Sequence, residues 1–366
     1  MPNQKPTAVV IAPYLGVHKE VTQEILAGRT STASDKLQVK PLIESLNMLD
    51  YKTNAISLNK NFKIDDLQEL NHPEICFVSK LRSHPTEDDH IYAMFHQSCI
   101  LNLKRKGSKI AVLYSDNLAR KDTPDGELYK NILFLSDAVI SPSSILISHA
   151  KKWTSPQTLT AVVKDPCLIP QKPYKNLSAN DICQVLWFGN NSNIQYLRHT
   201  LSQLLHNSPR QRRYQFTFLA TAEGLKEIAL ILSDITDLPN WRFRLVEWKY
   251  NDQPKQLTEE LCSAHITFIP SNPTDPDKSG VSHNRLTDSI QSGCIAVASP
   301  MDSYLELAKV SLIGDNLSQL FNKAVIEYNR LSQKYASYRQ TYLRPFQPQE
   351  NYVTWKKIIS IIRQMD

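Results

Sequence analysis

The chain has 366 residues, a formal net charge of +6, and contents of 41% hydrophobic and 21% charged residues. This composition excludes a disordered or fibrous protein, and the length is sufficient for two domains that each bury a core. The mild positive charge is compatible with an anionic small molecule, a membrane surface or nucleic acid, so it selects none of them.

The sequence carries no strong targeting, metal-binding or membrane-spanning signal. Its six cysteines form no C-x-x-C pair and show no metal-ligand spacing, which favours buried and reduced thiols. The segment His84–His96 matches no H-E-x-x-H pattern, so we expect no metal. The N-terminal apolar stretch is too short for a signal peptide, and no window approaches the roughly 20 apolar residues that span a bilayer. We therefore expect a cytoplasmic protein with at most peripheral membrane contact.

Short apolar runs alternate with helical patterns in the first half of the chain. Runs of this length between helical segments are typical of buried strands in a parallel sheet. The predicted strands are Ala8–Pro13, Ile75–Ser79, Ile110–Tyr114 and Ala138–Ser141. Helical periodicity lies between them, in Leu37–Leu49 and Tyr92–Leu103.

A proline-rich passage, DPCLIPQKPYKNLSAND at residues 165–181, follows the segment Thr160–Lys164. It has no periodicity, and such a composition shift is typical of a linker. We therefore predict an N-terminal domain over residues 1–165 and a C-terminal domain over residues 166–345. Residues 346–366 contain an amphipathic segment, which predicts a helix that can cross back to the first domain.

The alternation restarts after the linker. The predicted strands are Val185–Phe188, Gln215–Leu219, Arg242–Val246, Ile266–Ile269 and Ile295–Ala298. The predicted helices are Ile194–Leu205, Glu223–Leu232, Lys255–Cys262 and Asn284–Ser292. Strands that alternate with helices form βαβ crossovers. The predicted fold class is therefore α/β, with two Rossmann-like doubly wound domains that face each other across a cleft.

The densest group of polar side chains is the loop Ser271–Arg285, between a predicted strand and a predicted helix. In α/β proteins this position holds phosphates. Lys278 offers a point charge, Arg285 a planar fork for two phosphate oxygens, and the helix amides near Asn284 partial positive charge. A solvated turn, with Asn284 serving only as a helix cap, explains the same residues equally well.

Three further residues of this region are candidate ligand contacts. Ser279 and His283 belong to the same loop. Asp288 lies one turn into the helix and shares a face with Asn284, because residues i and i+4 lie on one side of a helix. Its carboxylate can accept hydrogen bonds from ribose hydroxyls, although an acid is also favoured near a helix N-terminus for local electrostatic reasons.

Two other loops follow predicted strands of the second half. In LWFGNNSN, Gly189 allows a ligand to approach the backbone closely, and Asn190 follows it. The single glycine does not support a G-x-G-x-x-G dinucleotide site. Trp248, in VEWKYN, can stack on a base, although packing beneath the loop is the commoner role of such a residue.

In the first half, Gly16 and His18 follow the first predicted strand, and Gly16 is a further candidate ligand contact. His18 is a candidate acceptor contact or base, although a lone loop histidine usually serves neither role. The basic cluster at residues 208–216 is better explained as a solvated turn than as a nucleic-acid patch, so we expect no nucleic-acid partner.

These segments together resemble GT-B-fold glycosyltransferases of the group-1 type, which use nucleotide-sugar donors. The second half is similar to their nucleotide-binding domain through VVKDP, LWFGNNSN, VEWKYN, AHITFIPSN and SHNRLTDSIQSGCIAVASPMDSYLEL, within Ala161–Leu307. SDNLARKD and LFLSDAVISPSS are similar to the last part of the acceptor domain. The first hundred residues match only in strand–helix rhythm and in Gly16.

The resemblance assigns roles to particular positions. Asp288 occupies the place of a Glu that binds the donor ribose, and Gly280 stands where an earlier acid is expected. The family often carries an Arg and a Lys after the LWFG-type strand, whereas this chain has Asn190 and its polar neighbours there. Lys278 and Arg285 are then expected to take over the phosphate contacts.

The resemblance implies a glycosyltransferase, retaining and hexosyltransferase-like, with a nucleoside diphosphate sugar as donor and no required cofactor. Lys278 and Arg285 would stabilise the leaving diphosphate, with His18 as the third catalytic candidate. The acceptor stays open among a glycan, a lipid-linked sugar, a protein and a metabolite. The alternatives are a catalytically silent nucleotide-sugar-binding protein, favoured by Gly280, and a nucleotide-sugar epimerase of the same fold.

Overall fold

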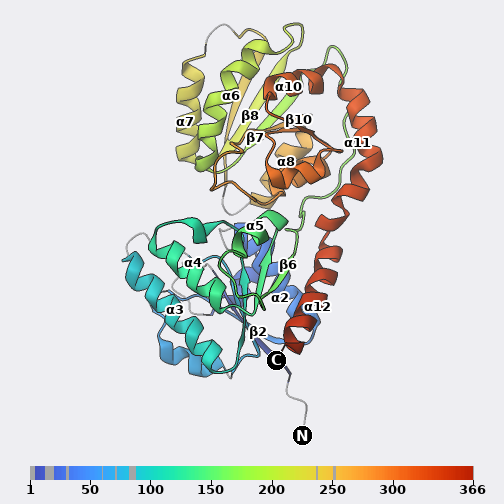
Figure 1. Cartoon of the computed structure of the whole chain (residues 1–366). Helices are drawn as coiled ribbons and strands as arrows, with labels where there is room; N and C mark the ends of the chain where they lie inside the picture. The colour runs from blue at the N-terminus through green and yellow to red at the C-terminus, as the bar shows by residue number, and fades with distance from the viewer. Residues whose placement is uncertain are drawn as a thin grey trace. The chain divides into compact units, whose positions relative to one another are not determined.

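The computed structural model describes residues 5–12, 20–29, 33–59, 61–70, 72–81, 88–235, 238–249 and 253–365 (Figure 1). Contacts between residues divide the chain into two compact units. The first unit consists of Met1–Pro166, Ser279–Ser282 and Gln347–Asp366, and the second of Cys167–Lys278 and His283–Phe346. Each unit contains a six-stranded sheet whose ladders are all parallel.

The sheet of the first unit has the strand order β2-β1-β3-β4-β5-β6. Its strands are β1 (Thr7–Ile11), β2 (Lys52–Ile56), β3 (Ile75–Val78), β4 (Lys109–Leu113), β5 (Ala138–Ser141) and β6 (Leu159–Val162). Most of their residues are buried, because helices cover both faces of a doubly wound sheet. The prediction missed β2, whose sequence KTNAI is polar over its first half and therefore gives no apolar run.

Helices of the first unit follow the strands in alternation. They are α1 (Thr22–Leu26), the π-helix η1 (Asp35–Val39), α2 (Lys40–Met48), η2 (Ile64–Leu70), α3 (Asp89–Arg105), η3 (Leu118–Arg120), α4 (Pro124–Leu135), α5 (Ser144–Ala150) and α12 (Pro348–Gln364). Side chains cap the N-termini of α3, α4 and α5, in the order Asp88, Thr123 and Ser143. Helix α12 packs on α2, and its Trp355 meets Phe77 edge-on with ring centroids 6.1 Å apart.

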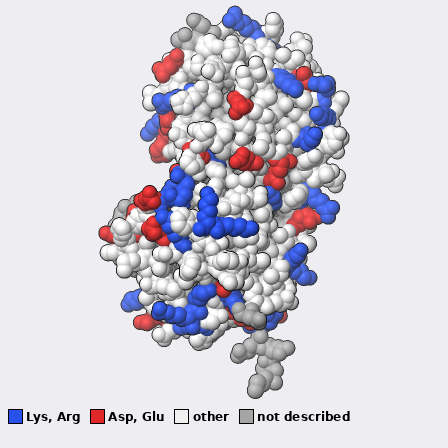
Figure 2. Space-filling view, in the orientation of Figure 1, with Lys and Arg blue, Asp and Glu red and all other residues white. Residues whose placement is uncertain are grey.

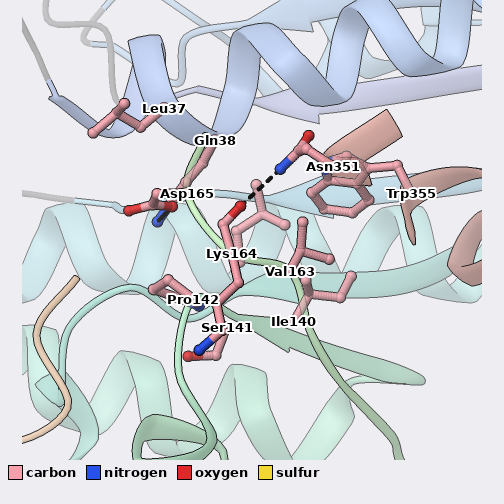
Figure 3. A pocket seen from close by; sticks show the side chains of 11 residues that line it. Leu37, Gln38, Ile140, Ser141, Pro142, Val163, Lys164, Asp165, Asn351 and Trp355 are labelled. Atoms are coloured by element: carbon pink, nitrogen blue, oxygen red, sulfur yellow. Dashed lines mark hydrogen bonds between the residues drawn. The ribbon is translucent and has the colours of Figure 1, made fainter. Parts of the chain in front are cut away.

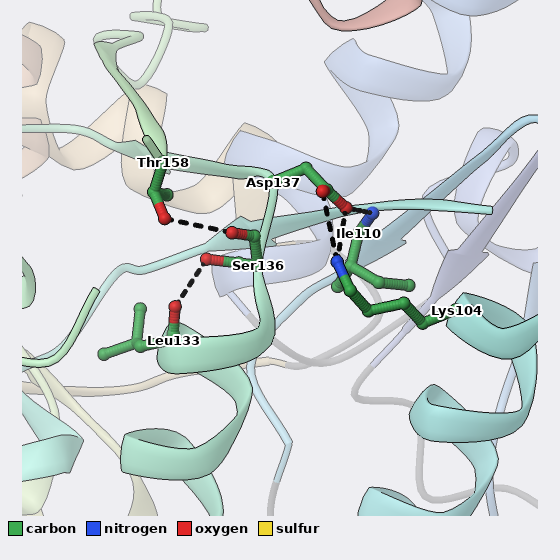
Figure 4. A network of polar contacts seen from close by, with 6 residues as sticks. All are labelled: Lys104, Ile110, Leu133, Ser136, Asp137 and Thr158. Atoms are coloured by element: carbon green, nitrogen blue, oxygen red, sulfur yellow. Dashed lines mark hydrogen bonds and ion pairs between the residues drawn. The ribbon is translucent and has the colours of Figure 1, made fainter. Parts of the chain in front are cut away.

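A polar network ties the amino ends of β4 and β5 to neighbouring helices (Figure 4). Both carboxylate oxygens of Asp137 accept from Lys104 of α3, at 3.0 and 3.1 Å, and one also accepts from the Ile110 amide at 2.7 Å. Next to it, the Ser136 carbonyl accepts from Thr158 at 3.0 Å. Ligands of doubly wound sheets bind at the carboxyl ends of strands, so this network is structural.

Positive charge gathers on one part of the first unit. Figure 2 shows Lys and Arg side chains over α4 and α5. Lys151 and Lys152 follow α5 and are exposed, and Lys130 of α4 lies 5.0 Å from the centroid of the Trp153 ring. The net charge of the chain is therefore unevenly distributed over this face.

The sheet of the second unit has the strand order β12-β11-β10-β7-β8-β9. Its strands are β7 (Cys183–Phe188), β8 (Tyr214–Ala220), β9 (Trp241–Glu247), β10 (Ile266–Ile269), β11 (Ile295–Ala298) and β12 (Leu312–Ile313). Its helices are η4 (Asn191–Asn193), α6 (Ile194–Asn207), α7 (Ala222–Ser233), α8 (Gln253–Ser263), α9 (Asn284–Gln291), η6 (Asp302–Leu307), α10 (Leu317–Ile326), α11 (Tyr328–Leu343) and η7 (Arg344–Phe346). These two sheets confirm the predicted α/β class with two doubly wound domains.

The strand order of the second unit sets the place of its site. The chain runs from β7 outward through β8 to β9, and then returns to place β10 on the other side of β7. Neighbouring strands whose connections leave in opposite directions form a topological switch point, where ligands bind in open α/β sheets. The loops that follow β7 and β10 therefore meet at one edge of the sheet. None of the helices in the described part of the chain is long and apolar enough to cross a membrane.

Candidate functional site

The turn after β7 forms one wall of the site. The Gly189 amide donates to the Leu219 carbonyl at 3.3 Å, and a Cβ at this position would lie 3.2 Å from Nδ2 of Asn193. Asn190 is exposed at the start of the turn, and η4 and α6 follow. The turn is thus tight, and it presents polar groups to solvent.

Lys278 lies against the same turn. Its Nζ donates to Oδ1 of Asn193 at 3.2 Å and lies 5.7 Å from the centroid of the Tyr196 ring. The hydroxyl of Tyr196 in turn donates to Asp275, in the loop that follows β10. These contacts fix the ammonium group beside the N-terminus of α6, where helix amides also contribute positive potential.

Arg285 approaches the turn from α9. Its guanidinium carbon lies 5.8 Å from the centroid of the Trp187 ring and 5.5 Å from that of Phe188, the last residue of β7. The Nε and Nη2 atoms are buried, and no residue in the described part of the chain accepts a hydrogen bond from them. Burial lowers the pKa of Arg285, and the nearby Tyr304 partly offsets this effect. A guanidinium still stays charged at neutral pH, so these donors are costly unless an anion meets them.

His283 supports the start of α9. The residue is 1% exposed, its imidazole pairs with the carboxylate of Glu306, and its ring lies 5.1 Å from that of Phe346. Its carbonyl accepts from the amides of the third and fourth residues of the helix, at 2.8 and 2.9 Å. The His283 side chain therefore anchors the start of α9. Asn284, the first residue of the helix, is half-exposed.

Asp288 lies one turn further along α9 and is half-exposed. Its Oδ1 accepts a hydrogen bond from the thiol of Cys167 at 3.2 Å. Sequence reasoning placed Asp288 on the face of Asn284, but it did not anticipate the thiol, because Cys167 stands 121 residues earlier in the chain.

Ser279 and Gly280 belong to the first unit, not to the unit of Lys278 and Arg285. The Ser279 hydroxyl lies 2.9 Å from Nε2 of His149, and the Gly280 carbonyl accepts from the hydroxyl of Ser143 at 2.8 Å. Gly280 has φ +76°, and a Cβ there would come within 2.8 Å of the Leu146 side chain. The absence of an acid at position 280 thus has a physical reason, since no side chain fits this conformation and space.

Asp165 is a buried carboxylate that sequence reasoning missed. It accepts hydrogen bonds from Ser282 at 2.5 Å and from Gln38 at 3.2 Å. Burial raises its pKa to about 6, although both hydrogen bonds act in the opposite direction. Figure 3 shows Asp165 and Gln38 beside a cavity of about 10 Å³, where Asn351 of α12 donates to the Lys164 carbonyl at 2.8 Å. A DP dipeptide at the start of the linker was the only local signal.

The remaining predicted residues have different outcomes. Trp248 follows β9 and is half-buried; its amide donates to the Ala220 carbonyl at 2.7 Å, and its buried Nε1 has no acceptor within the described ranges. Gly16 and His18 lie outside the described residues.

Arg213, in the basic cluster, donates at 3.0 Å to the Asn180 carbonyl of the linker, which gives it a structural contact. Among the residues that the structure describes, no group of three or more His, Cys, Asp or Glu is placed to hold a metal ion.

Comparison with solved structures identifies the fold. The chain is similar to HepE of Anabaena in complex with UDP, with a TM-score of 0.64 and 10% identity over 98% of this chain and 100% of that one. The TM-score is also 0.64 to sucrose-phosphate synthase of Thermosynechococcus elongatus, at 11% identity over 98% and 99% of the two chains. For S. aureus TarM in complex with UDP and two further ligands, it is 0.55 at 10% identity over 82% and 58%. No protein-family model and no curated protein matches the sequence. The fold is therefore GT-B, as predicted.

Proposed function

We propose that the chain is a glycosyltransferase that moves a sugar from a nucleoside diphosphate sugar to an acceptor in glycan or glycoconjugate biosynthesis. The observation that carries this proposal is the buried guanidinium of Arg285, which has two donor atoms without an acceptor within the described residues. It lies beside the turn after β7, at the switch point of a nucleotide-binding type of sheet. A diphosphate has the charge and the oxygens that such a group requires.

The proposed chemistry uses Lys278 and Arg285 as the catalytic cations. When the bond between the sugar and the diphosphate breaks, the electron pair stays on the phosphate oxygen, and negative charge increases there. Two fixed cations and the first amides of α9 stabilise this developing charge more than they stabilise the bound donor. Electrostatic stabilisation of the leaving group is thus the main contribution that these residues make to the rate.

The nucleoside would contact the residues around the diphosphate. Asp288, one turn along α9, accepts hydrogen bonds from the ribose hydroxyls, and Asn284 and the backbone at His283 line the approach. Gly189 lets the ligand come close to the backbone of the turn, beside Asn190. Trp248 supplies an aromatic face for the base, because its ring is half-buried at the end of β9.

A uridine diphosphate sugar is the donor that we propose. The solved HepE structures include complexes with UDP and with UDP-glucose, and that of pneumococcal GtfA contains UDP and GlcNAc. The resemblance in sequence further suggests transfer of a hexosyl group with retention of configuration and without a required cofactor. The acceptor is left open among a glycan, a lipid-linked sugar, a protein and a metabolite, and His18 is its candidate contact. Gly16 and Ser279 stay candidate contacts of the donor.

A thermal-shift screen tests the proposal. UDP, GDP, ADP and TDP, each with its sugars, would be added to the purified protein, because a ligand that binds the folded state raises its stability by mass action. We expect a response to UDP and its sugars, together with slow hydrolysis of the UDP-sugar to UDP in the absence of an acceptor. A protein that responds to none of these nucleotides is not a transferase of this kind.

A catalytically silent nucleotide-sugar-binding protein is the second candidate. Gly280 favours it, because the resembling family carries an acid there and Leu146 leaves no room for a side chain. Binding of UDP-sugar without hydrolysis, and without transfer to any acceptor of an extract, would support this candidate. An isomerised sugar nucleotide would instead indicate an epimerase.

A further inference from the structure

The first residues of the linker run along α9. The Lys172 amide donates to the Gln291 carbonyl at 2.9 Å, and its carbonyl accepts from Arg339 of α11 at 2.5 Å. Gly293, with φ +75°, ends the helix where the Pro173 carbonyl approaches so closely that a Cβ would clash with it. The segment Cys167–Pro173 is therefore fixed to the helix that carries Asp288.

Cys167 begins this segment and is held on both sides. Its amide donates to the Phe346 carbonyl at 2.8 Å, and its Sγ lies 3.2 Å from Oδ1 of Asp288. The residue is only 4% exposed, so a buried thiol meets the half-exposed carboxylate of Asp288. Burial and the adjacent carboxylate both raise the pKa of the thiol, which consequently stays protonated and acts as the donor.

A hydrogen bond to one carboxylate oxygen restricts the side-chain torsions of Asp288. An aspartate on a helix surface otherwise exchanges between rotamers. A ligand that requires one rotamer then binds more weakly, because the side chain loses conformational entropy on binding. A buried donor whose own backbone is fixed removes this loss before the ligand arrives. Preorganisation of this kind raises affinity without any new contact to the ligand.

We propose that Cys167 is a positioning residue for donor recognition, whose thiol holds Asp288 in the orientation that receives the ribose hydroxyls. The proposal rests on the proposed function, because it needs Asp288 as a ribose contact. Cys167 itself touches no part of the nucleotide. Its effect is confined to the discrimination between a ribose and a deoxyribose.

Calorimetric titration with UDP and with 2′-deoxyuridine 5′-diphosphate tests this role. We expect the unsubstituted protein to bind UDP roughly tenfold or more tightly than the deoxy analogue, since a hydrogen bond to a charged group is lost. Asp288→Ala should abolish this preference. Cys167→Ala and Cys167→Val remove the donor with a smaller and a larger side chain, and both should reduce this preference several-fold. Cys167→Ser, which keeps a donor, should restore it.

Two controls separate positioning from packing. Cys183→Ala removes another fully buried thiol of the same unit and should leave the preference unchanged. The double variant Cys167→Ala/Asp288→Ala should show the same ratio of UDP affinity to deoxy-analogue affinity as Asp288→Ala alone, because both substitutions act on one contact. Affinity for the deoxy analogue should stay near that of the unsubstituted protein in every cysteine variant.

The possible results are distinct. Full preference for UDP in Cys167→Ala and Cys167→Val, combined with its loss in Asp288→Ala, would overturn the role of Cys167 while the ribose contact stands. Equal binding of the two nucleotides by the unsubstituted protein would overturn both the ribose contact and this inference. Absence of binding of either nucleotide would reject the proposed function itself.

Discussion

The substitution Asp165→Asn should stabilise the first unit at neutral pH and leave its stability unchanged in acid. The carboxyl is buried, with a pKa of about 6 in the folded protein against 3.8 for an ordinary aspartate. The folded state therefore binds this proton more tightly than the unfolded state does. The stabilisation that the protonated Asp165 carboxyl gives to the folded state is fully present below pH 3.8, and it is lost as the pH rises through about 6.

The size of the effect follows from the same pKa values. A rise of about two pKa units corresponds to about 3 kcal/mol of unfolding free energy that is lost between acid and neutral pH. An asparagine has the same shape and no charge. Its carbonyl can still accept from Gln38, and the Ser282 hydroxyl can accept from its amide, because a hydroxyl both donates and accepts. The variant avoids the buried charge and should be more stable than the parent by up to about 3 kcal/mol at pH 7.5.

Urea unfolding at pH 4 and at pH 7.5 measures this difference, followed by circular dichroism and by amide hydrogen exchange in β4 and β5. Asp65→Asn, at an exposed carboxyl of the same unit, controls for the loss of one negative charge. The difference in free energy of unfolding between Asp165→Asn and the parent should be near zero at pH 4 and large at pH 7.5. A difference that is equal at the two pH values, or a variant less stable at pH 7.5, would refute the buried-charge reasoning.

Two glycine substitutions test the close approaches beside the site. Gly280→Ala places a Cβ at φ +76° and within 2.8 Å of the Leu146 side chain, so it should destabilise the first unit by about 1–3 kcal/mol in urea unfolding. An alanine tolerated without loss would show that the segment relaxes. Gly293→Ala clashes with the Pro173 carbonyl, a backbone atom, and should lower the midpoint of unfolding of the second unit by a comparable or larger amount. The exposed Gly107, also at positive φ but without a neighbour within 4 Å, is the matched control: Gly107→Ala should cost only the backbone strain.

Much of the fold could be predicted because its strands are continuous apolar runs. Segments such as β3, ICFV, and β11, IAVA, are buried at every position, so local composition identifies them. Strand β2 escaped prediction because only its last residues, Ala55 and Ile56, are buried. Pairing with β1 supplies the rest of its stability, and sequence periodicity contains no trace of that pairing.

The charged residues of the candidate site could be proposed from the sequence, whereas their contacts could not. Lys278, Arg285 and Asp288 became candidates because they flank a helix N-terminus that follows a strand. The stacking of Arg285 on the aromatic end of β7 depends on the strand order, in which β10 lies beside β7. Asp165 was missed for a related reason, since its partners Gln38 and Ser282 are 127 and 117 residues away in the chain.

We propose that the buried guanidinium of Arg285 binds the diphosphate of a donor, and the proposed function depends on this contact. Calorimetric titration of UDP into the unsubstituted protein, Arg285→Lys and Arg285→Ala tests it most directly, with Arg242→Ala as a control at an exposed arginine of the same unit. We expect Arg285→Ala to weaken UDP binding by roughly 100-fold, Arg285→Lys to retain part of the affinity, and Arg242→Ala to have no effect. We also expect Arg285→Ala to unfold at no lower urea concentration than the parent, because the substitution removes a buried charge whose Nε and Nη2 atoms meet no acceptor among the described residues. UDP binding of unchanged affinity in Arg285→Ala would contradict the claim.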